Sequence, residues 1–213
     1  MSTPAPRFLV VEGPIGVGKT SLARRIAKAY GTELMLERAE ENPFLERFYR
    51  DPRHYALPTQ LYFLFQRARQ LAALRQSDLF APVRVADFLL EKDRLFAQLN
   101  LADDELALYE QVYHALSLDA PAPDLVVYLQ APVEALMKRV QKRALAAEQP
   151  ITHDYLSKVA DSYMRFFHHY DRAPLLIVNA SDINPVESDL DFKTLMTQID
   201  KVRGGRHYFN PAR

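Results

Sequence analysis

The stretch Phe8-Leu-Val-Val-Glu-Gly-Pro-Ile-Gly-Val-Gly-Lys-Thr-Ser-Leu22 decides the fold. Its apolar start, residues 8–11, predicts a short buried strand of a parallel sheet. The pattern Gly13-x-x-x-x-Gly18-Lys19-Thr20 follows, and apolar residues then recur at helical spacing. Strand, glycine-rich loop and helix in this order are typical of a phosphate-binding loop. An ordinary turn would not require three glycines and a Lys-Thr pair at these positions, so we expect a nucleotide site.

Each part of this loop has a physical role in holding phosphates. Glycines let successive backbone N–H groups point at one anion, and the helix N-terminus adds partial positive charge there. Lys19 can reach the β- and γ-phosphates, and the Thr20 hydroxyl can bind Mg²⁺. The predicted nucleotide-binding residues of this segment are Gly13, Pro14, Ile15, Gly16, Val17, Gly18, Lys19, Thr20 and Ser21.

Composition narrows the class of protein. At 213 residues and 48% hydrophobic content, the chain can bury the core of one α/β domain, and we expect a single domain over residues 1–213. Its 27 basic residues balance 27 acidic ones, which argues against a nucleic-acid polymer or a membrane as partner. There is no cysteine, so disulfides and thiolate chemistry are excluded. No apolar run approaches the ~18 residues that span a bilayer, and residues 1–7 lack a signal region, so we expect a cytoplasmic protein.

Strands and helices alternate along the rest of the chain. Apolar runs predict further strands at residues 34–36, 83–87, 125–129 and 175–178. Helical spacing predicts helices near residues 43–49, 55–77, 89–99, 103–117, 132–143, 151–170 and 192–202, before a basic, mobile tail at 203–213. This alternation predicts a five-stranded, doubly wound parallel sheet with its active site at the carboxyl ends of the strands. Glu37 and Asp87 follow two of those ends.

Other residues must decide the reaction, because many classes of protein share a phosphate loop. GTPases read guanine with Asn-Lys-x-Asp, and the segment Asn179-Ala-Ser-Asp182 lacks the lysine. Lys138, Arg139, Lys142 and Arg143 precede a break in the helical pattern. These cations suit a lid over the phosphates of a small-molecule kinase, or simply a solvated helix face.

Glu37 distinguishes two kinds of kinase. An acceptor hydroxyl profits from a carboxylate that takes its proton, whereas an acceptor phosphate needs cations instead. Glu37, at the end of the second strand, is placed for the first role, although an acid at a strand end is as often a surface residue. Together with the loop, it favours a kinase that phosphorylates a hydroxyl.

With this loop and with Glu37 after the second strand, the chain resembles the deoxyribonucleoside kinase family, in particular its bacterial deoxyadenosine and deoxyguanosine kinases. The resemblance extends from the glycine loop to Tyr170. Glu37 and the pair Asn42-Pro43 keep the family spacing, although Arg38 stands where the family has a proline. The resemblance implies the family's P-loop kinase fold, with a parallel sheet flanked by helices and an arginine-containing lid.

The resemblance also implies roles around a bound nucleoside. Tyr49 would contact the sugar 3′-hydroxyl, and Gln60 would offer the base a donor and an acceptor side by side. Arg67 would pair with Asp93 on the far side of the base; members that take thymidine tend to lack this acid, so adenine, guanine or cytosine is favoured. Three aromatic residues would either sandwich the base or belong to the core, namely Phe44, Tyr55 and Phe96.

The family lid, Arg-x-x-x-Arg-Gly-Arg followed by Glu, corresponds to residues 139–148, and we expect the lid itself at about residues 143–150. Arg139 and Arg143 are retained, and the resemblance implies that they offset the developing negative charge. Glu148 matches a residue that contacts the 3′-hydroxyl. Leu145 replaces the last arginine, so one cationic contact is lost.

A larger departure follows the third strand. The family has Asp-Arg-Ser there, with the arginine bridging the catalytic acid and the phosphates, whereas this chain has Asp87-Phe88-Leu89. Asp87 can still organise Mg²⁺ through water, together with Thr20. Lys92 or Arg94, one helical turn further along, could supply the charge that Phe88 lacks.

The predicted function is transfer of the γ-phosphate of Mg²⁺-ATP to the 5′-hydroxyl of a deoxynucleoside in nucleotide salvage. Deoxyadenosine or deoxyguanosine is favoured, and deoxycytidine is a further possible acceptor. Asp182 and Ile183 would lie near the donor adenine, and the resemblance implies a homodimer. Two alternatives stay open: a nucleoside-monophosphate kinase, and a nucleotide-binding regulatory subunit with little turnover. The predicted catalytic residues are Glu37, Lys19, Arg139 and Arg143.

Overall fold

A six-stranded parallel sheet forms the centre of the molecule, in the order β2-β3-β1-β4-β5-β6. The computed structural model describes residues 8–76, 84–116, 121–181 and 183–211. The predicted doubly wound parallel sheet is confirmed. The strands are β1 (Phe8–Glu12), β2 (Glu33–Met35), β3 (Arg84–Ala86), β4 (Leu125–Gln130), β5 (Leu175–Asn179) and β6 (Arg206–Phe209).

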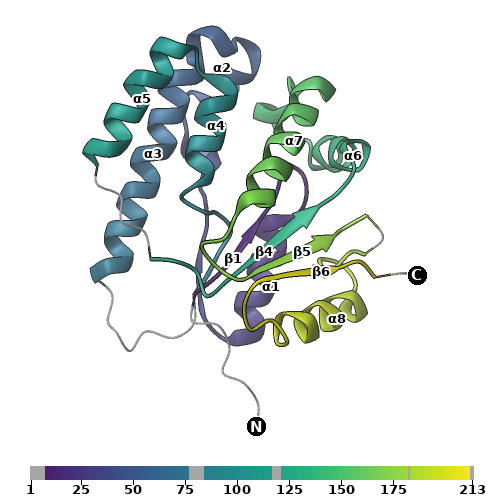
Figure 1. Cartoon of the computed structure of the whole chain (residues 1–213). Helices are drawn as coiled ribbons and strands as arrows, with labels where there is room; N and C mark the ends of the chain where they lie inside the picture. The colour runs from purple at the N-terminus through teal and green to yellow at the C-terminus, as the bar shows by residue number, and fades with distance from the viewer. Residues whose placement is uncertain (1–7, 77–83, 117–120, 182, 212–213) are drawn as a thin grey trace.

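Helices cover both faces of this sheet (Figure 1). They are α1 (Lys19–Tyr30), α2 (Leu45–Arg50), α3 (Pro52–Gln76), α4 (Lys92–Asn100), α5 (Asp103–Ala115), α6 (Val133–Arg143), α7 (His153–His169) and α8 (Asp189–Ile199), with 3₁₀ turns η1 (Ala39–Glu41) and η2 (Ala146–Glu148). Helices α1 and α8 pack on one face, whereas α4 and α7 pack on the other. A smaller apolar cluster joins α3, α4 and α5 away from the sheet.

The apolar run of β1 is buried on both faces. Leu9 and Val11 point into the core formed with α1 and α8, and Val10 points into the core formed with α4 and α7. All three side chains are fully buried. An uninterrupted apolar run, rather than an alternating one, is what a central parallel strand requires.

The strand order places the site. The chain leaves β1 for β2 and β3 on one side and reaches β4 on the other, so a crevice opens beyond the carboxyl end of β1. The segments that follow β1, β2 and β3 carry the glycine loop, Glu37 and Asp87 respectively. Residues far apart in the sequence therefore meet at one edge of the sheet.

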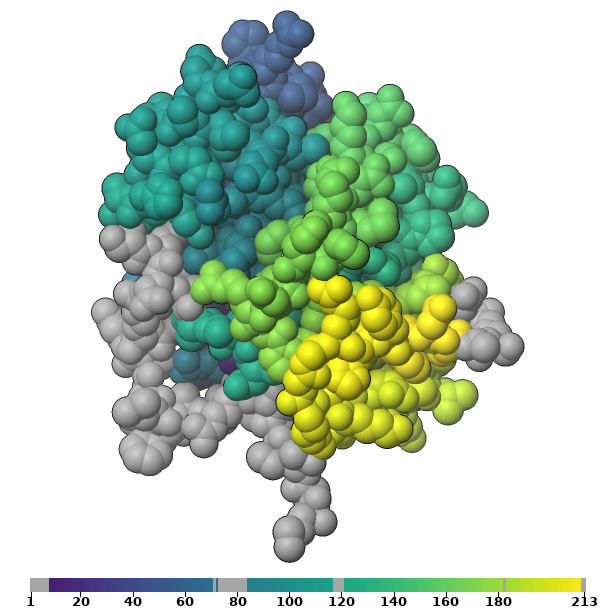
Figure 2. Space-filling model, in the orientation of Figure 1, coloured from purple at the N-terminus to yellow at the C-terminus, as the bar shows by residue number. Residues whose placement is uncertain are grey.

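The predictions of five strands and of a mobile tail at residues 203–213 are wrong where β6 forms. Residues Arg206–Phe209 pair in parallel with β5, and Figure 2 shows this C-terminal segment, in yellow, packed against the body of the molecule. Arg206 donates to the main-chain oxygens of Phe167, His168 and Tyr170 at the end of α7. Sequence patterns missed this edge strand because most of its side chains are exposed and leave no apolar signal.

Helix boundaries differ from the predicted ones by a few residues. α3 begins at Pro52, because proline is well suited to the first turn of a helix. α8 begins at Asp189, where the Ser188 hydroxyl caps the helix by accepting a hydrogen bond from the Asp191 N–H. Within the described ranges, no helix combines the length and apolarity that crossing a bilayer requires.

Candidate active site

The phosphate loop, residues 13–18, joins β1 to α1 and depends on backbone geometry. Gly16 has φ 82°, and a Cβ at this position would lie 2.8 Å from the main-chain oxygen of Leu136. Any side chain would therefore be strained and would clash. The first turn of α1 carries no acidic residue, so its N–H groups remain available for an anion.

Lys19, Thr20, Asp87 and Glu37 meet beside this loop. Lys19 Nζ donates to the main-chain oxygen of Pro14 at 3.3 Å. Burial lowers the pKa of Lys19, and the neighbouring Lys92 lowers it further. The Thr20 hydroxyl donates to Asp87 Oδ2, while Asp87 Oδ1 accepts from the Glu37 backbone N–H at 2.7 Å. The ends of β2 and β3 are thereby tied to the start of α1.

Thr20 and Asp87 fit a magnesium ion. They bring a hydroxyl and a carboxylate together beside the loop, and Mg²⁺ prefers such oxygen ligands. Burial raises the pKa of Asp87, and the hydrogen bonds from Thr20 and Glu37 oppose that shift. No cluster of three or more His, Cys, Asp or Glu side chains suited to a metal occurs in the described part of the chain. Two protein oxygens suffice for Mg²⁺, because it keeps waters and takes phosphate oxygens as ligands.

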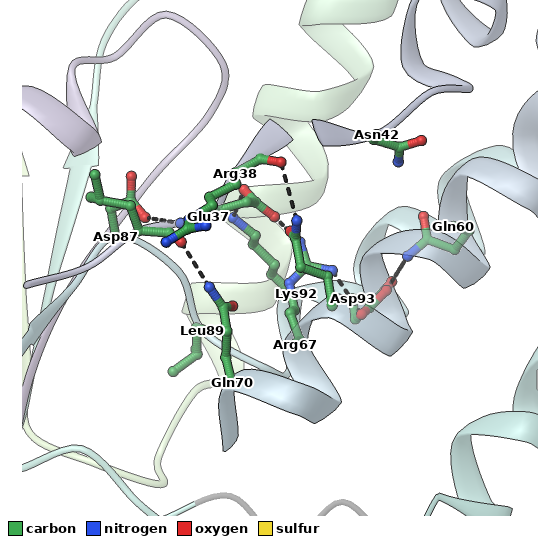
Figure 3. Close-up of polar contacts among 12 residues, drawn as sticks. Glu37, Arg38, Asn42, Gln60, Arg67, Gln70, Asp87, Leu89, Lys92 and Asp93 are labelled. Atoms are coloured by element: carbon green, nitrogen blue, oxygen red, sulfur yellow. Dashed lines mark hydrogen bonds and ion pairs between the residues drawn. The ribbon is translucent and has the colours of Figure 1, made fainter. Parts of the chain in front are cut away.

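The Glu37 carboxylate is held by two cations. One oxygen accepts from Arg67, and the other lies 2.8 Å from Lys92 Nζ. Burial alone would raise the pKa of Glu37, but Lys92 and Arg67 lower it to about 2. Figure 3 shows Glu37 between Asp87 on one side and Gln60 on the other. The carboxylate is therefore ionised at neutral pH.

A deep cavity, here called the central cavity, extends from the phosphate loop past Glu37 to α3, α4 and α7. The loop end contributes Ile15, Gly16, Gly18, Lys19, Thr20 and Ser21. Six of the predicted substrate-binding residues lie on its walls, namely Glu37, Tyr49, Gln60, Arg67, Phe96 and Glu148. The structure therefore brings together most of the residues that the sequence singled out.

Phe44 and Asp93 do not lie on the wall of this cavity. Phe44 immediately precedes α2, and Phe48, one helical turn later, lines the cavity instead. Asp93 is fully buried behind Gln60 and Arg67. The aromatic wall also includes three residues that sequence reasoning did not select as binding residues, namely Phe63, Tyr155 and Tyr163.

Asp93 fixes the orientation of the side chains in front of it. Gln60 Nε2 donates to the Asp93 main-chain oxygen at 2.9 Å and also to its carboxylate. Arg67 donates to Asp93 Oδ2 at 2.7 Å and, with its other terminal nitrogen, to Glu37. Burial would lower the pKa of Arg67, but Asp93 and Glu37 outweigh it and raise that pKa. A pair of carboxylates thus balances a buried guanidinium.

The predicted lid, residues 143–150, contributes two side chains to the cavity wall, those of Arg143 and Glu148. Arg143, the last residue of α6, donates to Glu148 through Nε at 3.1 Å and through a second nitrogen, and both side chains line the cavity. Tyr49 packs against Phe48 and Tyr155, with ring centroids 5.2 and 6.0 Å away. Leu145, which stands where the resemblance implies an arginine, is 48% exposed, and nothing in the structure explains the substitution.

A second cavity, here called the outer cavity, lies on the other side of the loop. Gly16, Gly18, Ser21 and Arg143 line both cavities, so the two meet there. The outer cavity is also lined by Val17, Arg139, Lys142, Ala180, Ile183 and the segment 184–187. Arg139 donates to the main-chain oxygens of Val17 and Ala180 at 3.2 and 3.0 Å.

Three predicted nucleotide-binding residues do not line either cavity or cannot be placed. Gly13 is absent from both walls, and Pro14 lines a separate groove near β6. Asp182 lies outside the described residues. The nucleotide contact of each residue stays a prediction.

The two basic residues that could compensate for Phe88 point in different directions. Phe88 is buried in the apolar core against α4 and α7. Lys92 points into the central cavity toward Glu37. Arg94 instead pairs with Glu110 on α5, at 2.9 Å. Of the two, the structure brings Lys92 to the site.

Glu12 is a site residue that sequence reasoning missed. Its buried carboxylate accepts from the Gly13 N–H, the Leu89 N–H and the Tyr163 hydroxyl, at 2.9, 2.8 and 3.1 Å. It also lies 3.3 Å from Lys92 Nζ. The available signal was an acid that directly continues an apolar strand, because such an acid is buried with the strand and must find partners.

A P-loop, a cavity with a carboxylate beside it and cationic side chains at the end of α6 are the features expected of a small-molecule kinase. The family model described as deoxynucleoside kinase matches residues 9–203. The chain therefore belongs to the deoxynucleoside kinase family, and the predicted family and class of enzyme are confirmed.

Curated relatives and solved structures agree with this membership. A deoxyguanosine kinase of Bacillus subtilis is 34% identical over 160 residues, which cover 73% of this chain and 76% of the relative. A deoxyadenosine kinase of Lactobacillus acidophilus is 27% identical over 210 residues, covering 92% and 95%. The structure of deoxyadenosine kinase from M. mycoides with bound dATP has a TM-score of 0.79 at 23% identity, covering 92% of this chain and all of that one. The P-loop kinase fold is confirmed.

Proposed function

We propose that this kinase transfers the γ-phosphate of ATP to the 5′-hydroxyl of a purine deoxynucleoside, with deoxyadenosine favoured. The observation that carries the proposal is the position of Glu37 in the central cavity, between the phosphate loop and Gln60. A nucleoside whose base contacts Gln60 would present its 5′-hydroxyl to Glu37 and, beyond it, to the donor phosphates. The outer cavity beside Ile183 would hold the donor nucleotide.

The proposed chemistry is an in-line phosphoryl transfer. The 5′-oxygen forms a bond to the γ-phosphorus, the bond from that phosphorus to the β–γ bridging oxygen breaks, and the hydroxyl proton passes to Glu37. A carboxylate with a lowered pKa is a weak base, but the loose transition state of phosphoryl transfer requires little proton removal before the new bond forms. Lys19 and the loop N–H groups would hold the transferring phosphates, and Arg139 and Arg143 would offset their charge.

The Thr20 hydroxyl would bind Mg²⁺ directly, and Asp87 would hold it through water. When bound, the ion neutralises charge on the donor phosphates. Because Asp87 also accepts from the Glu37 backbone N–H, the same carboxylate links the metal side of the site to the base.

The fixed orientation of Gln60 supports adenine over guanine. Because Gln60 Nε2 donates both to the Asp93 main-chain oxygen and to the Asp93 carboxylate, the amide oxygen is left to accept a hydrogen bond from the base. Adenine and cytosine carry an exocyclic amino group that can donate to this oxygen, whereas guanine has the acceptor O6 at the corresponding position. Guanine would require the amide to turn, which would set its oxygen against the Asp93 carboxylate. The size of the aromatic wall and the named relatives support a purine, although those relatives include both deoxyguanosine and deoxyadenosine kinases.

Purified protein with Mg²⁺-ATP, each of the four deoxynucleosides and their monophosphates tests this proposal, with products separated by chromatography. We expect deoxyadenosine to give the highest kcat/KM and the monophosphates to give no product. A nucleoside-monophosphate kinase would need free cations near the acceptor, and the cavity-lining arginines Arg67 and Arg143 are both paired with carboxylates. Phosphorylation of monophosphates only would overturn the proposal, and ATP binding without turnover would favour a regulatory subunit.

A homodimer and a cytoplasmic location belong to the same proposal. Phe65 on α3 and Leu108 on α5 leave 45% and 47% of their surfaces exposed, which supports a partner for the long helices. Consumption of ATP supports the cytoplasm as the place of action. Light scattering of the purified protein tests the dimer, and a mass of about 24.5 kDa, that of one chain, would contradict it.

A further inference from the structure

Lys92 is a buried cation with no role in the phosphoryl transfer proposed above for Glu37, Lys19, Arg139 and Arg143. It is the first residue of α4, only 3% of its surface is exposed, and it lines the central cavity. Its ammonium lies 2.8 Å from Glu37 Oε2 and 3.3 Å from Glu12 Oε1. Burying a lysine is costly unless carboxylates compensate, so both contacts are required for Lys92 to lie there as an ion.

Glu12 gives Lys92 a fixed position relative to the phosphate loop. The Glu12 carboxylate is fully buried and accepts from the N–H of Gly13, the first residue of the loop, and from the N–H of Leu89. The Tyr163 hydroxyl of α7 adds a third contact. A chain of contacts therefore runs from the loop through Glu12 and Lys92 to Glu37.

Glu37 lies beyond the end of the sheet, where side chains hold the backbone: Gln70 and Gln66 donate to the main-chain oxygens of Leu36 and Arg38. Glu37 itself follows the three-residue edge strand β2, and its backbone is held by Asp87. Its carboxylate must point at a hydroxyl that lies in line with the donor phosphate, and a misplacement of about 1 Å can cost ~10²-fold in rate. Arg67 holds one oxygen from the side of the base, and Lys92 holds the other from the side of the loop.

We propose, on the basis of the proposed function, that Lys92 is the positioning residue that aims Glu37 at the acceptor hydroxyl. It thereby supplies the cationic contact with the catalytic acid that the chain lacks at Phe88, but not the contact with the phosphates. The side chain of Phe88 belongs to the core, and Arg94 is committed to Glu110, so neither can do this. Position 92 is four residues after position 88, so both lie beyond the same end of β3. A cation at position 92 reaches Glu37 from the first turn of α4, whereas one at position 88 would reach it from the loop before that helix.

The first test compares Lys92→Met with Arg94→Met, a matched control two residues along the same helix. Lys92→Met is expected to lower kcat for deoxyadenosine by about 10- to 100-fold while KM for ATP changes less than threefold. Arg94→Met is expected to stay within twofold of the wild type in both. Lys92→Arg, which keeps the charge, is expected to regain most of the lost kcat. If Lys92→Met does not fold in a thermal melt, Lys92→Gln replaces it.

The second test is a cycle with Glu37→Gln. A residue that acts through Glu37 has nothing to position once that carboxylate is gone, so Lys92→Met should cost less than threefold more in the Glu37→Gln background. Losses that multiply would show that Lys92 acts on the phosphates directly and would overturn the inference. If the wild type is active and Lys92→Met has the same kcat, this inference is wrong and the proposed function stands. If the wild type phosphorylates no nucleoside, the proposed function is wrong and this inference falls with it.

Discussion

The phosphate loop and the central cavity are two regions of one site that are built in different ways. The loop is one continuous segment, residues 13–18, and its shape rests on backbone conformations such as that of Gly16. The central cavity is assembled from side chains as distant in sequence as Glu37 and Tyr163, and it rests on ion pairs. The loop therefore depends on local geometry, and the cavity depends on a balance of buried charges.

This difference predicts that substitutions separate into two kinetic classes. Changes at the loop should affect the ATP side, because its groups surround the donor phosphates. Changes in the cavity should affect the acceptor side and leave ATP binding intact. A cavity variant that weakens ATP binding, or a loop variant that weakens nucleoside binding, would show where the two regions are coupled.

The largest expected effect comes from Lys19, which directly follows the loop as the first residue of α1. Lys19→Met should lower kcat/KM for ATP by about 10³-fold, because the charge that faces the transferring phosphate is lost. The fold should remain, since Lys19 Nζ donates only to the Pro14 carbonyl and makes no ion pair closer than 4 Å in the described structure. Steady-state kinetics and a thermal melt check both expectations. Lys28→Met, an exposed position on the same helix, is the control, and a loss under tenfold at Lys19 would mean that the backbone of the loop suffices.

The next effect comes from the cavity, at Glu37. Glu37→Gln should lower kcat by ~10² or more and leave the Kd for ATP within threefold, because the amide neither takes the hydroxyl proton nor pairs with Lys92 and Arg67. Single-turnover kinetics and ATP titration measure the two quantities. Glu40→Gln, exposed on η1, serves as the matched control. Undiminished turnover in Glu37→Gln would remove Glu37 from its role.

The same contrast explains what the sequence could predict. The position and role of the phosphate loop could be predicted because one local sequence pattern, from the strand at residues 8–11 to Thr20, contains all of its chemical groups. Glu37, Gln60 and Arg67 were selected through the spacing that the chain shares with a family, and the structure does place them in one cavity. Local patterns and a shared spacing thus identified most of the candidate site.

The rest depends on tertiary contacts. Lys92 and Arg94 are two residues apart on α4, and they point in different directions. Lys92 lies on the face of the helix that meets Glu37, whereas Arg94 lies on the face that meets Glu110. Glu12 gains its partners only when α7 and the segment before α4 pack against β1. β6 was missed because an exposed edge strand leaves no apolar pattern.

A smaller effect is expected at Gln60, and it tests whether this residue recognises the base of the nucleoside. Gln60→Leu should lower kcat/KM for deoxyadenosine by about tenfold, because one hydrogen bond of about 1.4 kcal/mol to the base amino group is lost. The preference for deoxyadenosine over deoxyguanosine should shrink at the same time, and KM for ATP should not change. Competition assays with the two nucleosides measure the preference, and Gln98→Leu, exposed on α4, is the control. An unchanged preference would place the discrimination elsewhere on the wall.

The smallest expected effect is at Tyr49. It tests whether a change in the cavity can affect nucleoside binding alone and leave phosphoryl transfer unchanged. Burial raises the pKa of Tyr49 well above its ordinary value, so its hydroxyl is a protonated donor. Its ring is held by Phe48 and Tyr155, so Tyr49→Phe should remove the hydroxyl without moving the wall. KM for deoxyadenosine should rise about fivefold, the equivalent of one hydrogen bond of about 1 kcal/mol, with kcat within twofold. Tyr55, although predicted as a candidate to stack on the base, does not line the cavity, so Tyr55→Phe should change neither value. The loss should also vanish with 2′,3′-dideoxyadenosine, because that nucleoside has no 3′-hydroxyl to bond. Equal losses with both nucleosides would show that the hydroxyl supports the protein rather than the sugar, and Tyr49 would then belong with the residues that shape the cavity instead of those that bind in it.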